Sequence, residues 1–255
     1  MDQARPRAAA IIADALPRRF ADEAAFDRLA RVLPNLERDP RFRRGEVELS
    51  LERTRALLRA LGDPLRGIAV IHVAGSKGKG STCLFASALL AAQGVRVGTY
   101  LSPHVDSWCE RVQVDGRPLA VAQLGRCVAA VLAAARRARL GAPTLFETLT
   151  AAAFVAFRRA RVAVAVVEVG IGGLRDATNV VRSDVAVVTA IEREHVAVLG
   201  RTLAAIAAQK AGIFKRAAAA LSGVPHRSAP AAVIRAAARR VGVRCAEWGR
   251  ELAGR

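Results

Sequence analysis

The sequence has few aromatic residues and no nucleic-acid-binding motif. Aromatic side chains make up 4% of the 255 residues, and the arginines behind the net charge of +18 are dispersed along the chain. A nucleic-acid partner is therefore not expected, and an alanine- and arginine-biased composition explains the charge more simply. The charge still favours polyanionic substrates in a general way.

The sequence also lacks a segment suited to a membrane. Its most apolar run, Val162 to Leu174, is short and holds Glu168 in its middle, whereas a spanning helix needs about 20 apolar residues. Asp14 interrupts the apolar run from Ala8 to Leu16, which also lacks the ending of a secretory signal. We expect a cytoplasmic protein with no membrane partner, most simply a monomer.

Cysteine and lysine are both scarce. The four cysteines are scattered without metal-ligand spacing, which predicts free thiols in a chain long enough to bury a sizeable core. Lysine occurs four times against 36 arginines, and all four lysines fall in two short motifs: Lys77, Lys79, Lys210 and Lys215. The two side chains are not interchangeable where a compact ammonium is needed, so these motifs are candidate functional sites.

The most informative stretch runs from Ile68 to Thr82. A β-branched run leads into a glycine-rich turn, and the alanine- and leucine-rich segment Cys83 to Gln93 that follows predicts a helix. Such a turn holds phosphate with its N–H groups and the positive helix end, while Lys79 adds charge and Ser81 offers an oxygen to Mg²⁺. A glycine-rich turn can also be a plain tight connection, and the spacing departs from the usual phosphate loop.

The strand before the turn, the helix after it and the Lys-Gly-Ser-Thr ending favour phosphate binding. The predicted phosphate-binding residues are Gly75, Ser76, Lys77, Gly78, Lys79, Gly80, Ser81 and Thr82. We expect them to hold a nucleoside triphosphate.

Strand and helix patterns alternate along the whole chain. This alternation predicts an α/β fold, a mostly parallel sheet with helices on both faces. Expected strands after the phosphate loop are Val95 to Leu101, an edge strand Glu110 to Asp115, Ala163 to Val169, Asp184 to Ala190, Ala217 to Ser222 and Val243 to Ala246. Expected helices are Ala24 to Val32, Leu49 to Leu61, Val121 to Leu140, Phe146 to Arg159, Leu203 to Ile213 and Pro230 to Val241.

Three chemically suited side chains are expected at one edge of this sheet, where open α/β folds bind ligands. Ser81 follows the first strand, Glu168 lies near the end of a buried strand, and His195 follows a further strand. Together they could hold Mg²⁺. Each also has a plainer interpretation: Glu168 could be a buried, paired carboxylate, and His195 an ordinary loop histidine. Lys210 could simply be a cation at a helix C-terminus.

At these residues the chain resembles the folylpolyglutamate synthase/dihydrofolate synthase family of the Mur ligase superfamily. The similarity runs from about Leu49 to about Val243. The matching segments are His72 to Thr82, Ser102 to Val105 with Glu110 and Arg111, Phe146 to Thr150, Glu168 to Gly173, Asp176 to Asn179, His195 with Leu199 and Gly200, and Lys210 to Lys215.

The resemblance implies a reaction and a set of sites. The reaction is ADP-forming ligation, in which a folate or pteroate carboxylate takes the γ-phosphate of ATP and the amine of L-glutamate then opens the acyl phosphate. It implies Lys79, Glu168, His195 and Lys210 as catalytic residues, and Ser81, Glu168, His195 and Lys210, the last carbamylated, around magnesium. It further implies Asn179 at the nucleotide, and Ser102, Pro103, His104, Arg111, Phe146 and Asp176 at the substrate.

The resemblance also sets the expected domains, and it leaves two alternative functions open. We expect a helical lead-in at residues 1–48, the Mur ligase central ATP-binding domain at 49–247, and a short truncated linker at 248–255 with the family's C-terminal domain absent. A separate chain that supplies this domain is the alternative. The family usually has Asp-His where this chain has Glu194-His195, which leaves metal or water placement open. The alternatives are a truncated nucleotide- or folate-binding module without full ligase activity, or a Mur-type ligase for another acid.

Overall fold

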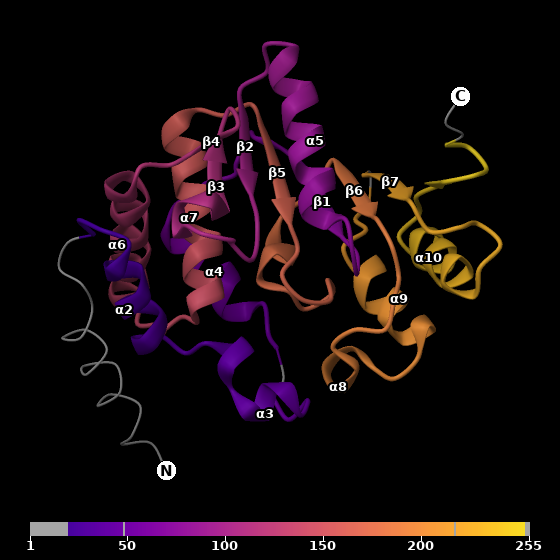
Figure 1. The fold of residues 1–255 in the computed structure, drawn as a ribbon, viewed down its shortest axis with the longest axis horizontal. Coiled ribbons are helices and arrows are strands. Elements are labelled where there is room, and N and C mark those ends of the chain that lie inside the picture. Colours follow the sequence, from indigo (N-terminus) through magenta and orange to yellow (C-terminus); the bar gives the residue numbers. More distant parts are fainter. Residues whose placement is uncertain (1–19, 48, 217, 253–255) are drawn as a thin grey trace.

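The computed structural model describes residues 20–47, 49–216 and 218–252. They form one eight-stranded sheet with the strand order β4-β3-β2-β5-β1-β6-β7-β8 (Figure 1). Six strands run parallel, and β3 and β4 are antiparallel additions at one edge. The strands are β1 Ala69–Ala74, β2 Val97–Tyr100, β3 Val112–Val114, β4 Arg117–Pro118, β5 Val164–Glu168, β6 Val185–Val188, β7 Ala219–Ser222 and β8 Cys245–Glu247.

Helices connect the strands and cover the sheet. They are α2 Ala24–Val32, α3 Pro40–Arg43, α4 Glu52–Ala60, α5 Lys79–Ala92, α6 Val121–Arg137, α7 Leu145–Ala160, α8 Val196–Leu199, α9 Leu203–Ala211 and α10 Ala229–Arg240. Three short 3₁₀ turns are η1 Leu36–Arg38, η2 Trp108–Arg111 and η3 Ala177–Val180. The predicted α/β fold with a mostly parallel sheet is confirmed.

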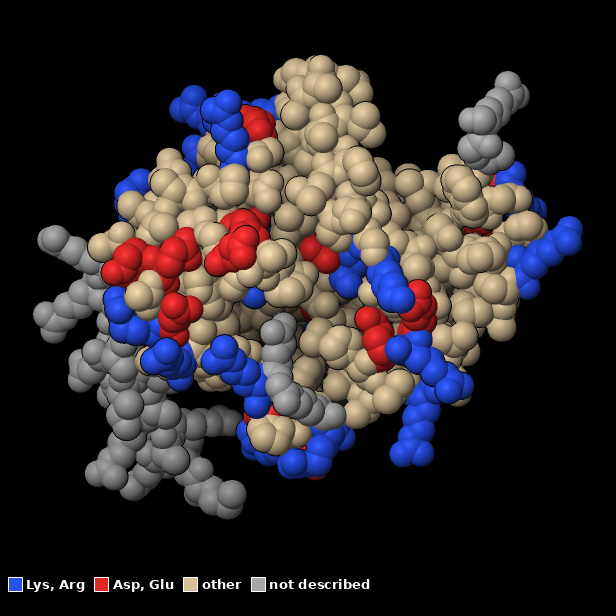
Figure 2. Space-filling model, in the orientation of Figure 1, with Lys and Arg blue, Asp and Glu red and all other residues tan. Residues whose placement is uncertain are grey.

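The two faces of the sheet are covered unequally. A large apolar cluster packs α2, α4, α6 and α7 against one face. A second cluster packs α9 and α10 against the part of the sheet formed by β1, β6, β7 and β8. In the described part of the chain, α5 covers the opposite face, where Cys83 packs against Val73, Val97 and Val166. The outer side of α5 leaves Phe85 72% exposed, and in Figure 2 this protruding helix shows almost no charged side chains.

The central strands follow from their sequences. β1 lies between β5 and β6, with Val73 opposite Glu168 and Ala74 opposite Val188. Both neighbours are short continuous apolar runs, as strands buried on both faces require. The carboxyl ends of these strands therefore meet at one edge, the lower edge of the sheet in Figure 1, and the N-terminus of α5 begins there.

Most expected elements form, with corrections at their ends. Glu110 and Arg111 were expected in an edge strand, but they belong to the 3₁₀ turn η2, and β4 lies outside β3. Serine capping explains the difference, because Ser107 accepts from the amide of Cys109 and Glu110 accepts from the amide of Ser107, which fixes a turn. The helix expected to reach Leu140 ends at Arg137. The strand residue Ala217 and residues 1–19 of the lead-in lie outside the described residues.

Two expectations from composition can be examined in the described residues. All four cysteines, Cys83, Cys109, Cys127 and Cys245, are buried free thiols, as predicted. No helix in the described ranges combines the length and apolar character needed to cross a membrane.

His72 is a polar residue in the middle of a core strand. Its side chain is fully buried, on the same face of β1 as Val70 and Ala74. Burial lowers the pKa of His72 to about 3, and the charge of Lys215 acts in the same direction. The unfolded chain has an ordinary histidine there, so it binds a proton at pH 5 that the folded chain does not.

This difference predicts a pH dependence of stability. Between pH 7 and pH 5 the native state should lose about 2 kcal/mol through His72, because the stabilisation falls as the pH drops below the unfolded pKa. In a His72→Gln variant, the change in the free energy of unfolding between pH 7 and pH 5 should be smaller by about 2 kcal/mol than in the wild type. Urea unfolding at the two pH values measures this change. The exposed His195→Gln variant controls for the loss of a histidine as such, and equal slopes in both variants would contradict the assignment.

Candidate active site

The glycine-rich turn has the geometry of an anion-binding loop. Gly78 adopts a left-handed conformation (φ 76°) and caps α5, which begins at Lys79. Lys79, Gly80 and Ser81 thus begin the first turn, and their N–H groups have no partners within the helix. The amide of Thr82 is the first to donate within the helix, to the carbonyl of Gly78 at 2.9 Å. Ser81 is exposed there, whereas the hydroxyl of Thr82 donates to the carbonyl of Gly78 at 2.7 Å.

The segment after β6 holds this loop in place. The amide of Ser76 donates to the carbonyl of Ala190 at 2.8 Å, and the hydroxyl of Thr189 donates to the carbonyl of Lys77 at 2.6 Å. Gly75 is required here, because a Cβ at that position would overlap the side chain of Thr189. The phosphate loop therefore depends on tertiary contacts as well as on its own glycines.

Two of the scarce lysines lie against acids beside the loop. Lys77 pairs with Glu192 at 2.7 Å in an exposed position. Lys210 is 1% exposed, pairs with Glu194 at 2.5 Å and donates to the carbonyl of Gly75 at 2.9 Å. Burial lowers the pKa of Lys210, and the nearby charge of Lys79 adds to this, while Glu194 opposes it. Lys210 thus lies beside the phosphate loop rather than at a free helix end.

Glu168 lies against the other side of the loop. Its Oε2 accepts from the amide of Ser102 at 3.0 Å and lies 3.5 Å from the position that a Cβ on Gly80 would take. Burial raises the pKa of Glu168, while the Ser102 amide and the charge of Lys79 oppose the rise. A buried carboxylate that accepts a single hydrogen bond from the described residues is costly to ionise, and a cation at this place would offset that cost.

The predicted metal ligands come together only in part. Glu168 and Ser81 belong to adjoining elements and offer oxygen, which suits Mg²⁺ held by one or two protein groups and phosphate. His195 lies seven residues beyond the end of β6, caps α8 with a positive φ of 43° and is exposed. Lys210 as an unmodified amine is a cation and not a ligand. In the residues the structure describes, no three His, Cys, Asp or Glu side chains form a group suited to a metal ion.

The loop between β2 and β3 brings the predicted substrate residues Ser102, Pro103, His104 and Arg111 together. The Ser102–Pro103 peptide is cis. Arg111 is buried, donates to Nδ1 of His104 at 2.8 Å and lies over the ring of Trp108 at 5.1 Å. Burial lowers the pKa of His104, and the charge of Arg111 adds to this. His104, Trp108 and Arg111 thus hold one another in place, and the amide of Ser102 donates to Glu168.

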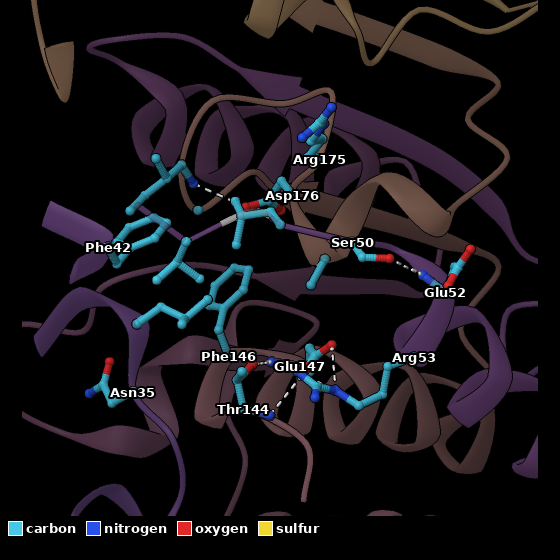
Figure 3. Close-up of a pocket in the computed structure, with 16 residues that line it drawn as sticks. Asn35, Phe42, Ser50, Glu52, Arg53, Thr144, Phe146, Glu147, Arg175 and Asp176 are labelled. Carbon is cyan, nitrogen blue, oxygen red and sulfur yellow. Dashed lines mark hydrogen bonds and ion pairs between the residues drawn. The ribbon is translucent and has the colours of Figure 1, made fainter. Parts of the chain in front are cut away.

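A cavity of about 330 Å³ lies next to the end of β5 (Figure 3). Its wall is formed by residues between 35 and 53, by the first turn of α7 and by residues 170–177 after β5. It includes the predicted substrate residues Phe146 and Asp176. Phe42 and Phe146 present aromatic rings to it in Figure 3. The ring of Phe146 lies against Gly170, where any Cβ would clash with it. The pocket is thus mainly apolar with a few placed polar groups, the usual form of a small-molecule site.

The short η3 turn presents Asp176 to this pocket, while Asn179 points inward. Asp176 accepts from the amides of Ile171 at 3.0 Å and Thr178 at 2.9 Å. Asn179 donates to the carbonyls of Leu174 and Gly212 and accepts from Lys215 at 2.7 Å. Both hydrogens of its amide are therefore used inside the protein, so donation to a nucleotide would require one of these bonds to break.

Sequence reasoning missed several pocket residues. Glu147 is buried and accepts from the amide of Thr144 at 2.7 Å, from Arg53 at 2.7 Å and from the hydroxyl of Thr54 at 3.1 Å. The signal was available, because Thr144 and Glu147 form a helix capping box ahead of an apolar run. No local pattern, by contrast, predicts that Arg53 pairs with Glu147 of α7 or that Phe42 lines the same cavity.

The fold and this edge define an α/β protein with a phosphate loop and an adjoining small-molecule pocket. A family model, the Mur ligase middle domain, matches residues 73–251. The chain belongs to the Mur ligase family.

Comparison with known proteins confirms the predicted resemblance to folylpolyglutamate and dihydrofolate synthases. The chain is 43% identical over 189 residues to the dihydrofolate synthase/folylpolyglutamate synthase of Mycobacterium tuberculosis, covering 70% of this chain and 39% of that protein. Among solved structures, E. coli FolC in complex with DHPP and ADP matches with a TM-score of 0.79 and 33% identity, covering 91% of this chain and 53% of that chain.

A bifunctional folylpolyglutamate synthase/dihydrofolate synthase with Mn, AMPPNP and L-glutamate bound matches with a TM-score of 0.77 and 33% identity, over 92% of this chain and 53% of that chain. The chain thus spans about half the length of these solved chains and less than half of the curated relative.

The contacts of Glu147 yield a prediction about the pocket wall. Replacing Glu147 with Ala removes the acceptor of the Thr144 amide in the capping box and leaves Arg53 and Thr54 without their acceptor, so the free energy of unfolding should fall by about 2–3 kcal/mol. Denaturant unfolding measures this loss. Glu52→Ala, an exposed acid on the same stretch of the wall, should change stability by less than about 0.5 kcal/mol. Equal effects of the two variants would show that the Glu147 contacts contribute nothing.

Proposed function

We propose that this chain is the nucleotide-binding part of an ATP-dependent ligase that adds L-glutamate to folate or pteroate, releasing ADP and phosphate. The observation that carries the proposal is the meeting of the phosphate loop, the buried Glu168 and an aromatic-walled pocket at one sheet edge. The relatives support it, since their names specify dihydrofolate and folylpolyglutamate synthesis and the solved ones hold ADP, AMPPNP, Mn and L-glutamate.

The proposed chemistry depends mainly on positioning and on neutralising charge. The loop amides at the start of α5 and Lys79 hold the β- and γ-phosphates of ATP. A substrate carboxylate attacks the γ-phosphorus to form an acyl phosphate, and ADP leaves. The amine of L-glutamate then attacks the acyl carbon, forming the amide and releasing phosphate. Mg²⁺, when bound by Glu168 and Ser81, supplies positive charge that stabilises the transferring phosphoryl group.

Lys210 has a proposed role as a carbamylated lysine next to the metal, together with His195. Carbamylation needs a neutral amine, which attacks the carbon of CO₂ and releases a proton. The burial that lowers the pKa of Lys210 increases the neutral fraction, and its place beside Gly75 brings the product close to the phosphates. The modified group would be an anion, so the present ion pair with Glu194 has to open when it forms.

The pocket and the loop after β2 have the proposed role of binding the acid substrate. Phe146 and Phe42 supply flat apolar surface for a ring, and Asp176 supplies an acceptor at its edge. Arg111, which donates to His104, places a cation near enough to Glu168 for its charge to favour the ionised carboxyl. A pteroate or folate would thus extend from the pocket towards the phosphate loop. Asn179 is the weakest nucleotide-binding candidate because both hydrogens of its amide are used inside the protein.

A direct assay tests the ligase. The polypeptide is incubated with ATP, Mg²⁺, tetrahydrofolate or dihydropteroate, and labelled glutamate, alone and with the C-terminal half of a relative supplied as a separate chain. Glutamylated product together with ADP supports the proposal. Tight binding of ATP and dihydropteroate with no ADP under both conditions would indicate a binding module instead. Tight binding of a different Mur-type acid, with none of dihydropteroate, would change the substrate class.

Lys79 gives a sharper prediction at the level of binding. Replacing Lys79 with Ala should weaken binding of a non-hydrolysable ATP analogue by about tenfold to hundredfold, because one hydrogen bond to a charged group is lost. Calorimetric titration measures the dissociation constant. Arg240→Ala removes a positive charge at the far end of α10 and should leave the constant within about twofold. Equal weakening in both variants would show only a general effect of net charge.

Mass spectrometry tests the modification of Lys210. Intact protein kept at neutral pH with bicarbonate should carry the mass of one added CO₂, and acid should remove it. Lys210→Arg should lack this mass, because a guanidinium does not form the carbamate. An unmodified wild-type protein under these conditions would contradict the proposed role.

A further inference from the structure

A buried chain of hydrogen bonds leads from the core strand β1 to the pocket wall. Nε2 of His72 lies 2.9 Å from the hydroxyl oxygen of Thr178, and that hydroxyl lies 2.5 Å from Oδ1 of Asp176. His72 and Thr178 are fully buried, and Asp176 is 5% exposed. Only Asp176 belongs to the pocket lining.

The direction of this chain follows from its donors and acceptors. Several donors point to the carboxylate of Asp176, among them the amides of Ile171 and Thr178 and the hydroxyl of Thr178. The amide of Gly170 adds a further backbone hydrogen bond. Because the Thr178 hydroxyl uses its proton on Asp176, it can only accept from His72. His72 must then carry its proton on Nε2.

The other ring nitrogen agrees with this assignment. Nδ1 of His72 is buried with no partner among the described residues. A buried lone pair without a partner is less unusual than a buried N–H without one, so the unpartnered Nδ1 is expected to be the bare nitrogen. The ring is neutral because burial lowers its pKa to about 3, and it therefore holds a single proton.

The turn that holds Thr178 is fixed from both sides. His72 anchors Thr178 to the sheet, and Asn179 anchors the next residue to Gly212 and Lys215 at the end of α9. The carboxylate of Asp176 therefore cannot move without disturbing β1, the strand that leads directly into the phosphate loop. This arrangement is more than filling the core requires, since an apolar residue at position 72 would avoid burying an imidazole.

We propose that His72 is a positioning residue for substrate binding, which acts through Thr178 to hold the Asp176 carboxylate as an acceptor facing the pocket. The ligand group that it orients is a ring bearing N–H donors, as the proposed pteroate substrate does, so the inference rests on the proposed function. His72 itself does not touch the ligand. Loss of its N–H leaves the Thr178 hydroxyl free to rotate away from Asp176.

Paired substitutions separate the two ring nitrogens. The amide of Gln reaches the place of Nε2, whereas the amide of Asn reaches only the place of Nδ1. Likewise Thr178→Ser keeps the hydroxyl, and Thr178→Val keeps the shape and removes it. The measurements are the dissociation constants of dihydropteroate and of a non-hydrolysable ATP analogue, made on the same preparations with their melting temperatures.

The expected result is selective. His72→Asn and Thr178→Val should weaken dihydropteroate binding by about tenfold, the effect of one lost hydrogen bond, with the ATP analogue within about twofold. His72→Gln and Thr178→Ser should stay close to the wild type. Equal loss of both ligands, or no difference within each pair, would overturn the proposal. If wild-type protein binds no dihydropteroate, the proposed function fails and this inference fails with it.

A spectroscopic measurement on the wild-type protein tests the direction of the chain. The chain has four histidines, so ¹⁵N-labelled histidine gives few ring signals, and the Thr178→Ser variant assists their assignment. His72 should show a protonated Nε2 and a bare Nδ1 that persist to pH 5. A proton on Nδ1, or a positively charged ring at that pH, would overturn the direction of the chain.

Discussion

The parallel pairing of β1 with β5 and β6 is the constraint on which the rest of the structure depends. It sets the end of β1, from which the phosphate loop starts, next to the end of β5, which carries Glu168. It also brings Thr189 and Ala190 after β6 against the loop. Without this register the phosphate loop would lose its contacts with Thr189 and Ala190, and Glu168 would lose the nearby charge of Lys79.

Buried charge at this edge is the second theme. Glu168, Lys210 and Asp176 all lie in places where burial opposes ionisation. Proteins seldom keep such groups without a partner. Lys210 has Glu194 and Gly75, Asp176 has the turn of Thr178, and Glu168 has one amide and the nearby charge of Lys79. Glu168 is thus the least compensated charge at this edge, and a nucleotide with a divalent cation would compensate it.

How far the site could be predicted differs from residue to residue. Gly78, Lys79 and Ser81 were predictable because a strand, a glycine turn and a helix in sequence dictate one local geometry. Phe146 and Asp176 were found through family resemblance, and both line the pocket. Asn179 carried the same kind of support, yet its amide is used inside the protein. His72 gave no signal, because a single histidine in an apolar strand reveals nothing of what packs above it.

The sequence by itself determined the class of fold, the phosphate loop and the order of the motifs, because each depends on local periodicity or on neighbours within a few residues. Only the tertiary structure decided that Arg53 and Glu147 close one pocket wall, that Glu194 meets Lys210, and that His72 reaches Asp176 through Thr178. These partners are separated by up to 106 positions in the chain. Such contacts are set by how helices and turns pack onto the sheet, which no short pattern of residues encodes.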